Sequence, residues 1–272
     1  SEQGKPGEKS TALDTEIQRS VWNAVIPIEL KLAEDDLATP VSPDPYYLLA
    51  PRIGYLPIVT STAESYFLDF VASRFDGMWF KHKNVPLKWH LPVGVLYDLL
   101  GEGKLPWTIE VNFQNFPADK LQRWGEDSLK SHFMNNLKEA NHLKDKNNAA
   151  INTLTREEQT NLWEAVKNQQ YKKYWDIYPK LGKSVDTIKF VPIRIISGNA
   201  SWMMPPVTSK KPGTDELILL SDIMSGYPQC EGCQPLIHGI VPPLETPIAW
   251  LAFHCAHPDN FLYITLVNSP AQ

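Results

Sequence analysis

The sequence predicts an α+β protein in which two similar units of strands and helices flank a helix-rich segment. Its 23 prolines among 272 residues argue against a long-helix bundle, because a proline breaks the interior of a helix. Two parts of the chain repeat the same order of alternating strand patterns and amphipathic helices. Between these parts, the apolar residues recur at helical spacing only.

The composition is that of an ordinary globular protein. Hydrophobic residues make up 43% of the chain and charged residues 21%. A chain of this mass can bury about 70% of its extended surface, so it needs no disulfide framework. The net charge of -5 and the pI of about 5.8 provide no general electrostatic reason to bind nucleic acid. We therefore expect no nucleic-acid partner.

Several features indicate a cytoplasmic protein. The chain contains no run of 18 apolar residues, and its N-terminal segment lacks the apolar core of a signal peptide. Its three cysteines, an odd number, agree with a reducing compartment. Residues 1–16 are polar and aperiodic, so we expect them to form a disordered tail.

The first unit, residues 17–117, begins with a strand pattern. Apolar residues alternate over 26–32, and Pro27 indicates either an edge position or the start of the strand. A turn-rich stretch then leads to a second apolar run over 46–55. These two segments predict a hairpin.

The rest of the first unit predicts two helices and a final strand. Ser61–Glu64 has the pattern of a capping box and is followed by apolar residues at helical spacing. Pro92 opens a short helix over 93–100 from the favoured first position. Apolar residues alternate again over 107–113, which predicts the last strand.

The second unit, residues 185–272, repeats the landmarks of the first. Pro27 and Pro192 each lie near the start of a strand, and Pro92 and Pro247 each open a helix. The spacing from the helix-opening proline to the last strand is also the same in both units, from Pro92 to Trp107 and from Pro247 to Leu262. The sequence therefore predicts two similar α+β units.

The segment between the units, residues 118–184, is predicted to be helix-rich. Thr155 and Glu158 have the spacing of a capping box at the start of its second helix. The first helix is expected over 126–146 because it carries an apolar stripe. That stripe consists of Leu129, Phe133, Leu137, Ala140 and Leu143.

The order of elements in each unit is that of a ubiquitin-like β-grasp fold: two strands, a helix, two strands, a short helix and a strand. Proteins of this fold serve as transferable modifiers or as interaction modules. A modifier needs a C-terminal glycine that can be activated, whereas this sequence has no glycine after Gly239. We therefore expect a recipient or a scaffold.

One group of residues could support metal or thiol chemistry. Cys230, Cys233, Cys255 and His257 are residue types that bind Zn²⁺ when they occur in closely spaced pairs. The gap between the pairs is longer than in the common finger pattern, and the acidic Glu231 disfavours a reactive thiolate. A zinc- or thiol-dependent enzyme remains the alternative function. Otherwise no cofactor is expected.

Five blocks of sequence between Val21 and Val267 carry a resemblance to a known family. They are residues 45–52 (PYYLLAPR), 86–100 (PLKWHLPVGVLYDLL), 132–140 (HFMNNLKEA), 238–247 (HGIVPPLETP) and 258–262 (PDNFL). In content and order they resemble the autophagy protein 5 family. The resemblance implies two ubiquitin-like β-grasp domains that flank a helix-rich domain. Residues 197–233 follow no motif of that family.

The resemblance also implies an attachment site. In the family, the lysine of the Phe-Met-x-x-x-Lys-Glu-Ala block forms an isopeptide bond with the C-terminal glycine of the ubiquitin-like autophagy protein 12. The matching residue here is Lys138. At about 100° per residue, Lys138 lies about 180° from Leu129 and therefore on the exposed face of the helix. Without the family, it would be taken for an ordinary solvated lysine.

The partners and activity that the resemblance implies are those of a scaffold. The conjugate would bind a helix of autophagy protein 16 in a groove formed by the three domains. It would contact the lipidation conjugating enzyme and promote transfer of autophagy protein 8-type modifiers to phosphatidylethanolamine. Ligase-like activity would belong to the complex, located peripherally at the pre-autophagosomal membrane. An adaptor without a covalent partner is a further alternative.

Overall fold

The structure is a computed structural model that describes residues 6–71, 77–181, 185–198, 202–203, 206–226 and 232–268. The chain divides into two compact units. One consists of residues 25–129, and the other combines residues 1–24 with residues 130–272. The N-terminal segment, most of the helix-rich segment and the second sheet thus belong to one unit.

The 25–129 unit is built on a five-stranded sheet of order β2-β1-β5-β3-β4. Strand β1 pairs antiparallel with β2 and parallel with β5. The strands are β1 (Val25–Leu32), β2 (Tyr46–Pro51), β3 (Trp79–His82), β4 (Val85–Pro86) and β5 (Trp107–Asn112). The helices are η1 (Glu34–Asp36), α2 (Leu56–Val59), α3 (Ser61–Leu68) and α4 (Val93–Leu100).

The other unit contains the second sheet, of order β7-β6-β10-β9, with β8 also paired to β6. Strand β6 pairs parallel with β10, as β1 does with β5 in the first sheet. The strands are β6 (Phe190–Ile196), β7 (Trp202–Met203), β8 (Pro206–Thr208), β9 (Cys233–Leu236) and β10 (Leu262–Asn268). Helices η3 (Val185–Thr187), α9 (Leu220–Ser225) and α10 (Ile248–Cys255) accompany them.

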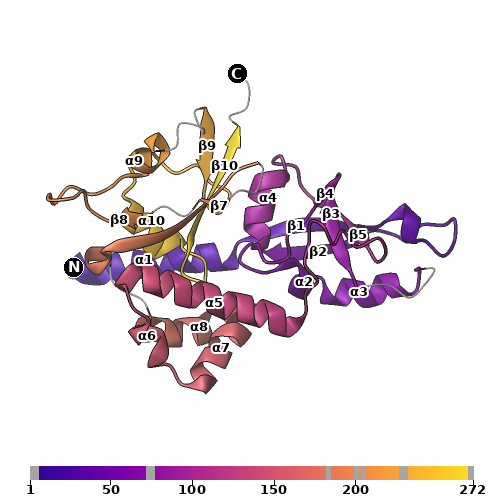
Figure 1. The fold of residues 1–272 in the computed structure, drawn as a ribbon, viewed down its shortest axis with the longest axis horizontal. Helices are drawn as coiled ribbons and strands as arrows, with labels where there is room; N and C mark the ends of the chain where they lie inside the picture. Colours follow the sequence, from indigo (N-terminus) through magenta and orange to yellow (C-terminus); the bar gives the residue numbers. More distant parts are fainter. Residues whose placement is uncertain are drawn as a thin grey trace, which may run out of the picture. The chain divides into compact units, whose positions relative to one another are not determined.

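The remaining helices are α1 (Pro6–Asn23), α5 (Glu126–Asp145), α6 (Ala149–Asn152), α7 (Arg156–Lys167), α8 (Tyr171–Ile177) and η2 (Tyr178–Lys180). Helix α5 is the longest helix of the chain's described part, and in Figure 1 helices α6, α7 and α8 are drawn below it. The predicted capping box of α7 is confirmed. The Glu158 backbone N–H donates to Thr155 Oγ1 (3.1 Å), and the Thr155 N–H donates to Glu158 Oε2 (2.9 Å).

The prolines mark equivalent places in the two sheets. Both β1 and β6 are interior strands, so the edge position considered for Pro27 is wrong. Pro27 and Pro192 are each the third residue of their strand, near its start but not at it. Parallel pairing begins one residue after each proline, at Ile28 and at Ile193, so neither proline lies in the parallel ladder. Pro92 and Pro247 are the N-cap residues of α4 and α10, so Pro92 lies one position before the first helical position that was expected for it.

The N-terminal segment differs from the sequence-based expectation of a disordered tail. Residues from Pro6 onwards form α1, which runs to Asn23. The helix packs on α10, and Trp22, only 4% exposed, contacts the rings of Tyr171 and Tyr174. Local composition misled the prediction, because this helix is stabilised by tertiary packing rather than by a regular apolar pattern of its own.

Two smaller expectations also need correction. Helix α3 has Thr60 as its N-cap and no side-chain capping bond, because α2 leads directly into it. The spacing of apolar residues over 215–224 also predicts a helix, but α9 begins only at Leu220. The preceding residues form a turn in which the Lys211 N–H donates to the Glu216 carbonyl (2.8 Å). No described helix is both long enough and apolar enough to cross a membrane.

Candidate functional site

Helix α5 presents one buried and one exposed face. Acidic residues begin it and His142 and Lys144 end it, which matches the polarity of a helix dipole. Leu129, Phe133, Leu137 and Ala140 are fully buried, as their helical spacing predicts. The buried stripe therefore determines which side chains of the helix remain accessible.

Lys138 lies on the exposed face of α5, as predicted. The positions three and four residues away, which are its neighbours on the helix surface, are Met134, Asn135, Asn141 and His142. None of these carries a carboxylate. The carboxylate of Glu139, the next residue, accepts from Arg194. Another protein can therefore reach Lys138 without first breaking an ion pair to a residue three or four positions away.

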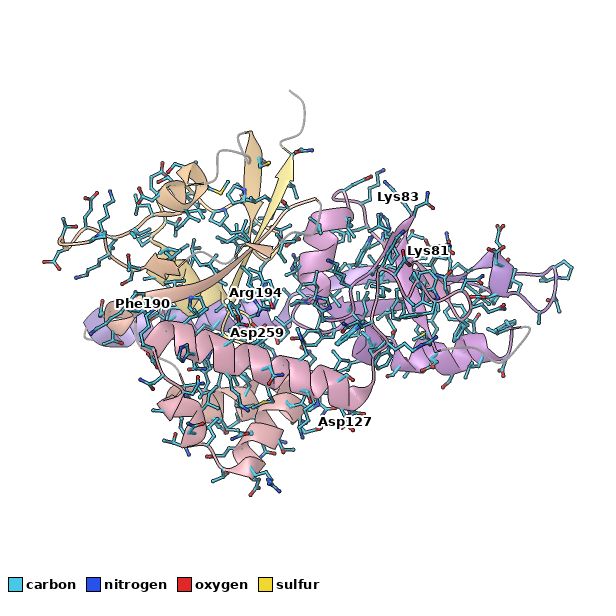
Figure 2. The ribbon with its side chains drawn as sticks, viewed as in Figure 1. Lys81, Lys83, Asp127, Phe190, Arg194 and Asp259 are labelled. Carbon is cyan, nitrogen blue, oxygen red and sulfur yellow. The ribbon has the colours of Figure 1, made fainter. Side chains whose placement is uncertain are left out.

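A ring of hydrogen bonds joins the inner side of α5 to the second sheet. Arg194 Nη2 on β6 donates to Asn136 Oδ1 (3.0 Å) and to Glu139 Oε2 (2.9 Å). Asn136 Nδ2 and the Tyr263 hydroxyl donate to Asp259 Oδ2 (3.1 and 2.8 Å). Arg194 Nη1 donates to the Tyr263 hydroxyl (3.2 Å), which closes the ring. We call Arg194, Asn136, Asp259 and Tyr263 the Arg194 ring; Figure 2 shows Arg194 and Asp259 beside α5.

The Arg194 ring is buried and contains charge. Arg194 is 5% exposed and Asp259 is 1% exposed. The guanidinium carbon lies 3.7 Å from the centre of the Phe261 ring, and the Phe261 N–H donates to Asp259 Oδ1 (3.1 Å). Burial raises the pKa of Asp259, against the opposing effects of Arg194 and the hydrogen-bond donors. Removing one partner would leave an uncompensated polar group in the interior.

An apolar groove of about 890 Å³ lies between α1, α10 and the segment that follows β9. Hydrogen bonds dock α1 against α10: Asp14 Oδ1 lies 2.8 Å from His254 Nε2, and Gln18 Nε2 donates to the Phe253 carbonyl (3.3 Å). We call this cavity the α1–α10 groove. Its lining includes Leu13, Ile17, Val21, Ile240, Val241, Trp250 and Leu251.

The groove exposes apolar side chains that a folded monomer would normally bury. Leu13 is 57% exposed, Ile240 60% and Val241 50%. A contiguous exposed apolar surface of this kind is typical of a binding groove. The sequence did not reveal it, because its walls come from segments more than 200 residues apart.

The structure does not support the zinc or thiol alternative. Cys230 lies outside the described residues. Cys233 Sγ lies 3.9 Å from Asn268 Oδ1, Cys255 is buried on α10, and the His257 ring stacks on His238 with centres 4.5 Å apart. Within the described ranges, no three His, Cys, Asp or Glu side chains are placed to hold a metal ion together.

The two described cysteines are expected to differ in reactivity. Burial raises the pKa of the Cys255 thiol to about 11, so it remains protonated near pH 8, whereas Cys233 is partly exposed. In a Cys230→Ser variant, a disulfide reagent at pH 8 should therefore modify one thiol in the folded protein and two in guanidinium. Equal reaction rates of both thiols in the folded protein would contradict this prediction.

The family resemblance selected Lys138 as a candidate and helix periodicity predicted its exposure, but neither pointed to the buried residues that bond to its helix. The available signal for Arg194 was a single charge in the otherwise apolar strand FVPIRII. Asp259 lies in the block PDNFL, which contributed to the family resemblance, but the resemblance implied no role for Asp259. The hydrogen bond between Asn136 and Asp259 joins residues that are 123 positions apart, so the pattern of neighbouring residues could not predict it.

Comparisons with known proteins agree along the chain. Residues 21–113 match the family described as Autophagy protein ATG5, UblA domain. Residues 126–184 match its alpha-helical bundle region, and residues 190–266 match its UblB domain. These assignments confirm the predicted fold class, two ubiquitin-like domains flanking a helix-rich one.

Individual relatives match over nearly their whole length. Autophagy protein 5 of Drosophila melanogaster is 30% identical over 270 residues, covering 94% of this chain and 98% of the relative. Autophagy protein 5 of Dictyostelium discoideum is 27% identical, with 96% and 97% covered. The crystal structure of Kluyveromyces marxianus Atg5 shares the fold with a TM-score of 0.82 at 20% identity, covering 93% of this chain and 100% of that one. The chain therefore belongs to the autophagy protein 5 family and has a role in autophagy.

Proposed function

We propose that the chain is the acceptor and scaffold of an autophagy conjugation complex, and that Lys138 forms an isopeptide bond with the C-terminal glycine of autophagy protein 12. The observation that carries this proposal is the environment of Lys138. It is exposed on a helix whose opposite face is anchored, and no carboxylate lies at the positions three and four residues away. Family membership and the matching Lys-Glu-Ala block add support.

The chemistry of attachment places few demands on the acceptor. The neutral Lys138 amine attacks the carbonyl carbon of a thioester between the modifier and its conjugating enzyme. A carbon–nitrogen bond forms, the carbon–sulfur bond breaks, the sulfur leaves as a thiolate and the amine loses a proton. The conjugating enzyme supplies the environment that deprotonates the amine, since an exposed lysine is mostly charged at neutral pH.

Our candidate for the site that receives a helix of autophagy protein 16 is the α1–α10 groove, which is lined by residues 13–21 and 237–255, and not a groove formed by all three domains. An amphipathic helix binds by placing its apolar face in a hydrophobic groove. The exposed Leu13, Ile240 and Val241 and the large Trp250 side chain supply apolar contacts of this kind. Glu16 and Glu245 also line the groove and could pair with basic residues beside that apolar face.

The assembled complex would act like a ligase, whereas the chain alone is not an enzyme. It would bring the lipidation conjugating enzyme, through the attached modifier, to phosphatidylethanolamine and so promote lipidation of autophagy protein 8-type modifiers. This role places the chain in the cytoplasm and peripherally at the pre-autophagosomal membrane. Neither a metal nor another cofactor is part of the proposal.

Replacing Lys138 by arginine tests the attachment site. Arginine keeps the positive charge and the helix propensity, but its guanidinium does not form the isopeptide bond. The Lys138→Arg variant should therefore lose the slow-migrating conjugate on a denaturing gel when it is expressed in cells with the conjugation enzymes. Mass spectrometry of the wild-type protein should detect a branched peptide at Lys138.

Lys130→Arg is a matched control, because Lys130 lies on the same helix and is partly buried. It should retain the conjugate at the wild-type level. A conjugate that persists in Lys138→Arg would show that the site is elsewhere. A wild-type protein without any conjugate would favour the adaptor alternative.

A further inference from the structure

We infer that Arg194 is a positioning residue for the acceptor lysine; this inference rests on the proposed conjugation at Lys138. The apolar stripe of α5 determines which face is buried, but hydrophobic contacts are non-directional. They therefore define the orientation of the helix less sharply than directional bonds do. Hydrogen bonds that involve charged groups are directional and stronger, so they can fix the helix where the stripe alone cannot.

Arg194 acts on the helical turn that carries Lys138. Its Nη2 atom bonds both Asn136 and Glu139, which are three residues apart on adjacent turns of one face. Lys138 lies between them in sequence and, at about 100° per residue, about 160° around the helix from Asn136. Rotation of α5 about its axis, or a shift along it, would lengthen both bonds. The pair of bonds therefore fixes the direction and height of the lysine side chain.

The residues that hold Arg194 are themselves held by the second sheet. Arg194 on β6 and Tyr263 on β10 are direct partners in the parallel pairing. Tyr263 also donates to Asp259, and the guanidinium packs on Phe261. The position of the acceptor lysine is thus set by β6 and β10 of the second ubiquitin-like domain, although the lysine belongs to the helix-rich segment.

Positioning matters for enzymatic transfer more than for ordinary lysine reactivity. A lysine held by a partner enzyme must approach the thioester carbon at a defined angle, and a displacement of about 1 Å can reduce such rates about 100-fold. A small acylating reagent in solution approaches from any direction and requires only exposure. The two reactions therefore distinguish a positioning role from a general loss of folding.

The test uses the full chain in single-turnover transfer from the charged conjugating enzyme. Arg194→Met should lower the maximal transfer rate by about tenfold or more, with little change in the acceptor concentration that gives half the maximal rate. Acetylation of Lys138 by a small activated ester, measured by mass spectrometry, should continue at the wild-type rate. Equal transfer by wild type and folded Arg194→Met would overturn the inference.

Two tyrosine variants provide a milder, matched test. Tyr263→Phe removes one hydroxyl from the Arg194 ring, whereas Tyr174→Phe removes a buried hydroxyl that donates to the Pro258 carbonyl (2.8 Å) outside the ring. Tyr263→Phe should slow transfer and Tyr174→Phe should not. Identical transfer rates for these two variants would overturn the inference. If Arg194→Met does not fold, the comparison of the two tyrosine variants decides the question. If Lys138 of the wild type accepts no modifier, the proposed function fails instead.

Discussion

Replacing Asp98 by alanine is expected to lower the unfolding free energy of the 25–129 unit by about 3–5 kcal/mol, because it leaves a buried charge without its partner. Asp98 on α4 forms an ion pair with Arg52, and their side chains are only 4% and 8% exposed. Arg52 also donates to the Gly94 carbonyl (3.3 Å), so its guanidinium remains fixed in the interior after the change. Urea unfolding followed by tryptophan fluorescence measures the loss.

An exposed ion pair of the same unit provides the control. Lys83 and Glu102 also form an ion pair, but their side chains are 60% and 49% exposed. Water solvates either partner when the other is removed, so Glu102→Ala should change the unfolding midpoint little. A loss in Asp98→Ala no larger than in Glu102→Ala would contradict the role assigned to burial.

A charge placed in the α1–α10 groove is expected to weaken binding of the partner helix by about 30-fold or more, which corresponds to about 2 kcal/mol. Ile240→Asp places a carboxylate among apolar side chains that a docked helix would remove from water. Because Ile240 is 60% exposed in the free protein, the fold should tolerate the change. Isothermal titration calorimetry with the helical segment of autophagy protein 16 measures the effect.

The matched control is Val85→Asp. Val85 is an exposed apolar residue of the 25–129 unit, 47% exposed and not among the residues that line the groove. Its substitution should leave the dissociation constant unchanged. Equal affinities of wild type and Ile240→Asp would show that the partner helix binds another surface.

The repeated prolines show which structural features could be predicted from neighbouring residues alone. A proline restricts its own backbone and cannot donate a hydrogen bond, so it is favoured near the start of a helix and is restricted to few positions of a strand. Pro92 and Pro247 therefore located two helices correctly, and Pro27 and Pro192 located two strands. The same information did not reveal that β1 and β6 are interior strands, because strand order depends on partners distant in sequence.

The sequence by itself determined the α+β class, the two-unit repeat and the exposed face of α5, since periodicity and proline placement are properties of neighbouring residues. Only the tertiary structure decided that residues from Pro6 form a docked helix, that an apolar groove lies between α1 and α10, and that Arg194 holds the turn of Lys138. Each of these features depends on contacts between segments far apart in the chain, where burial and hydrogen-bond geometry are set by the fold and not by local pattern.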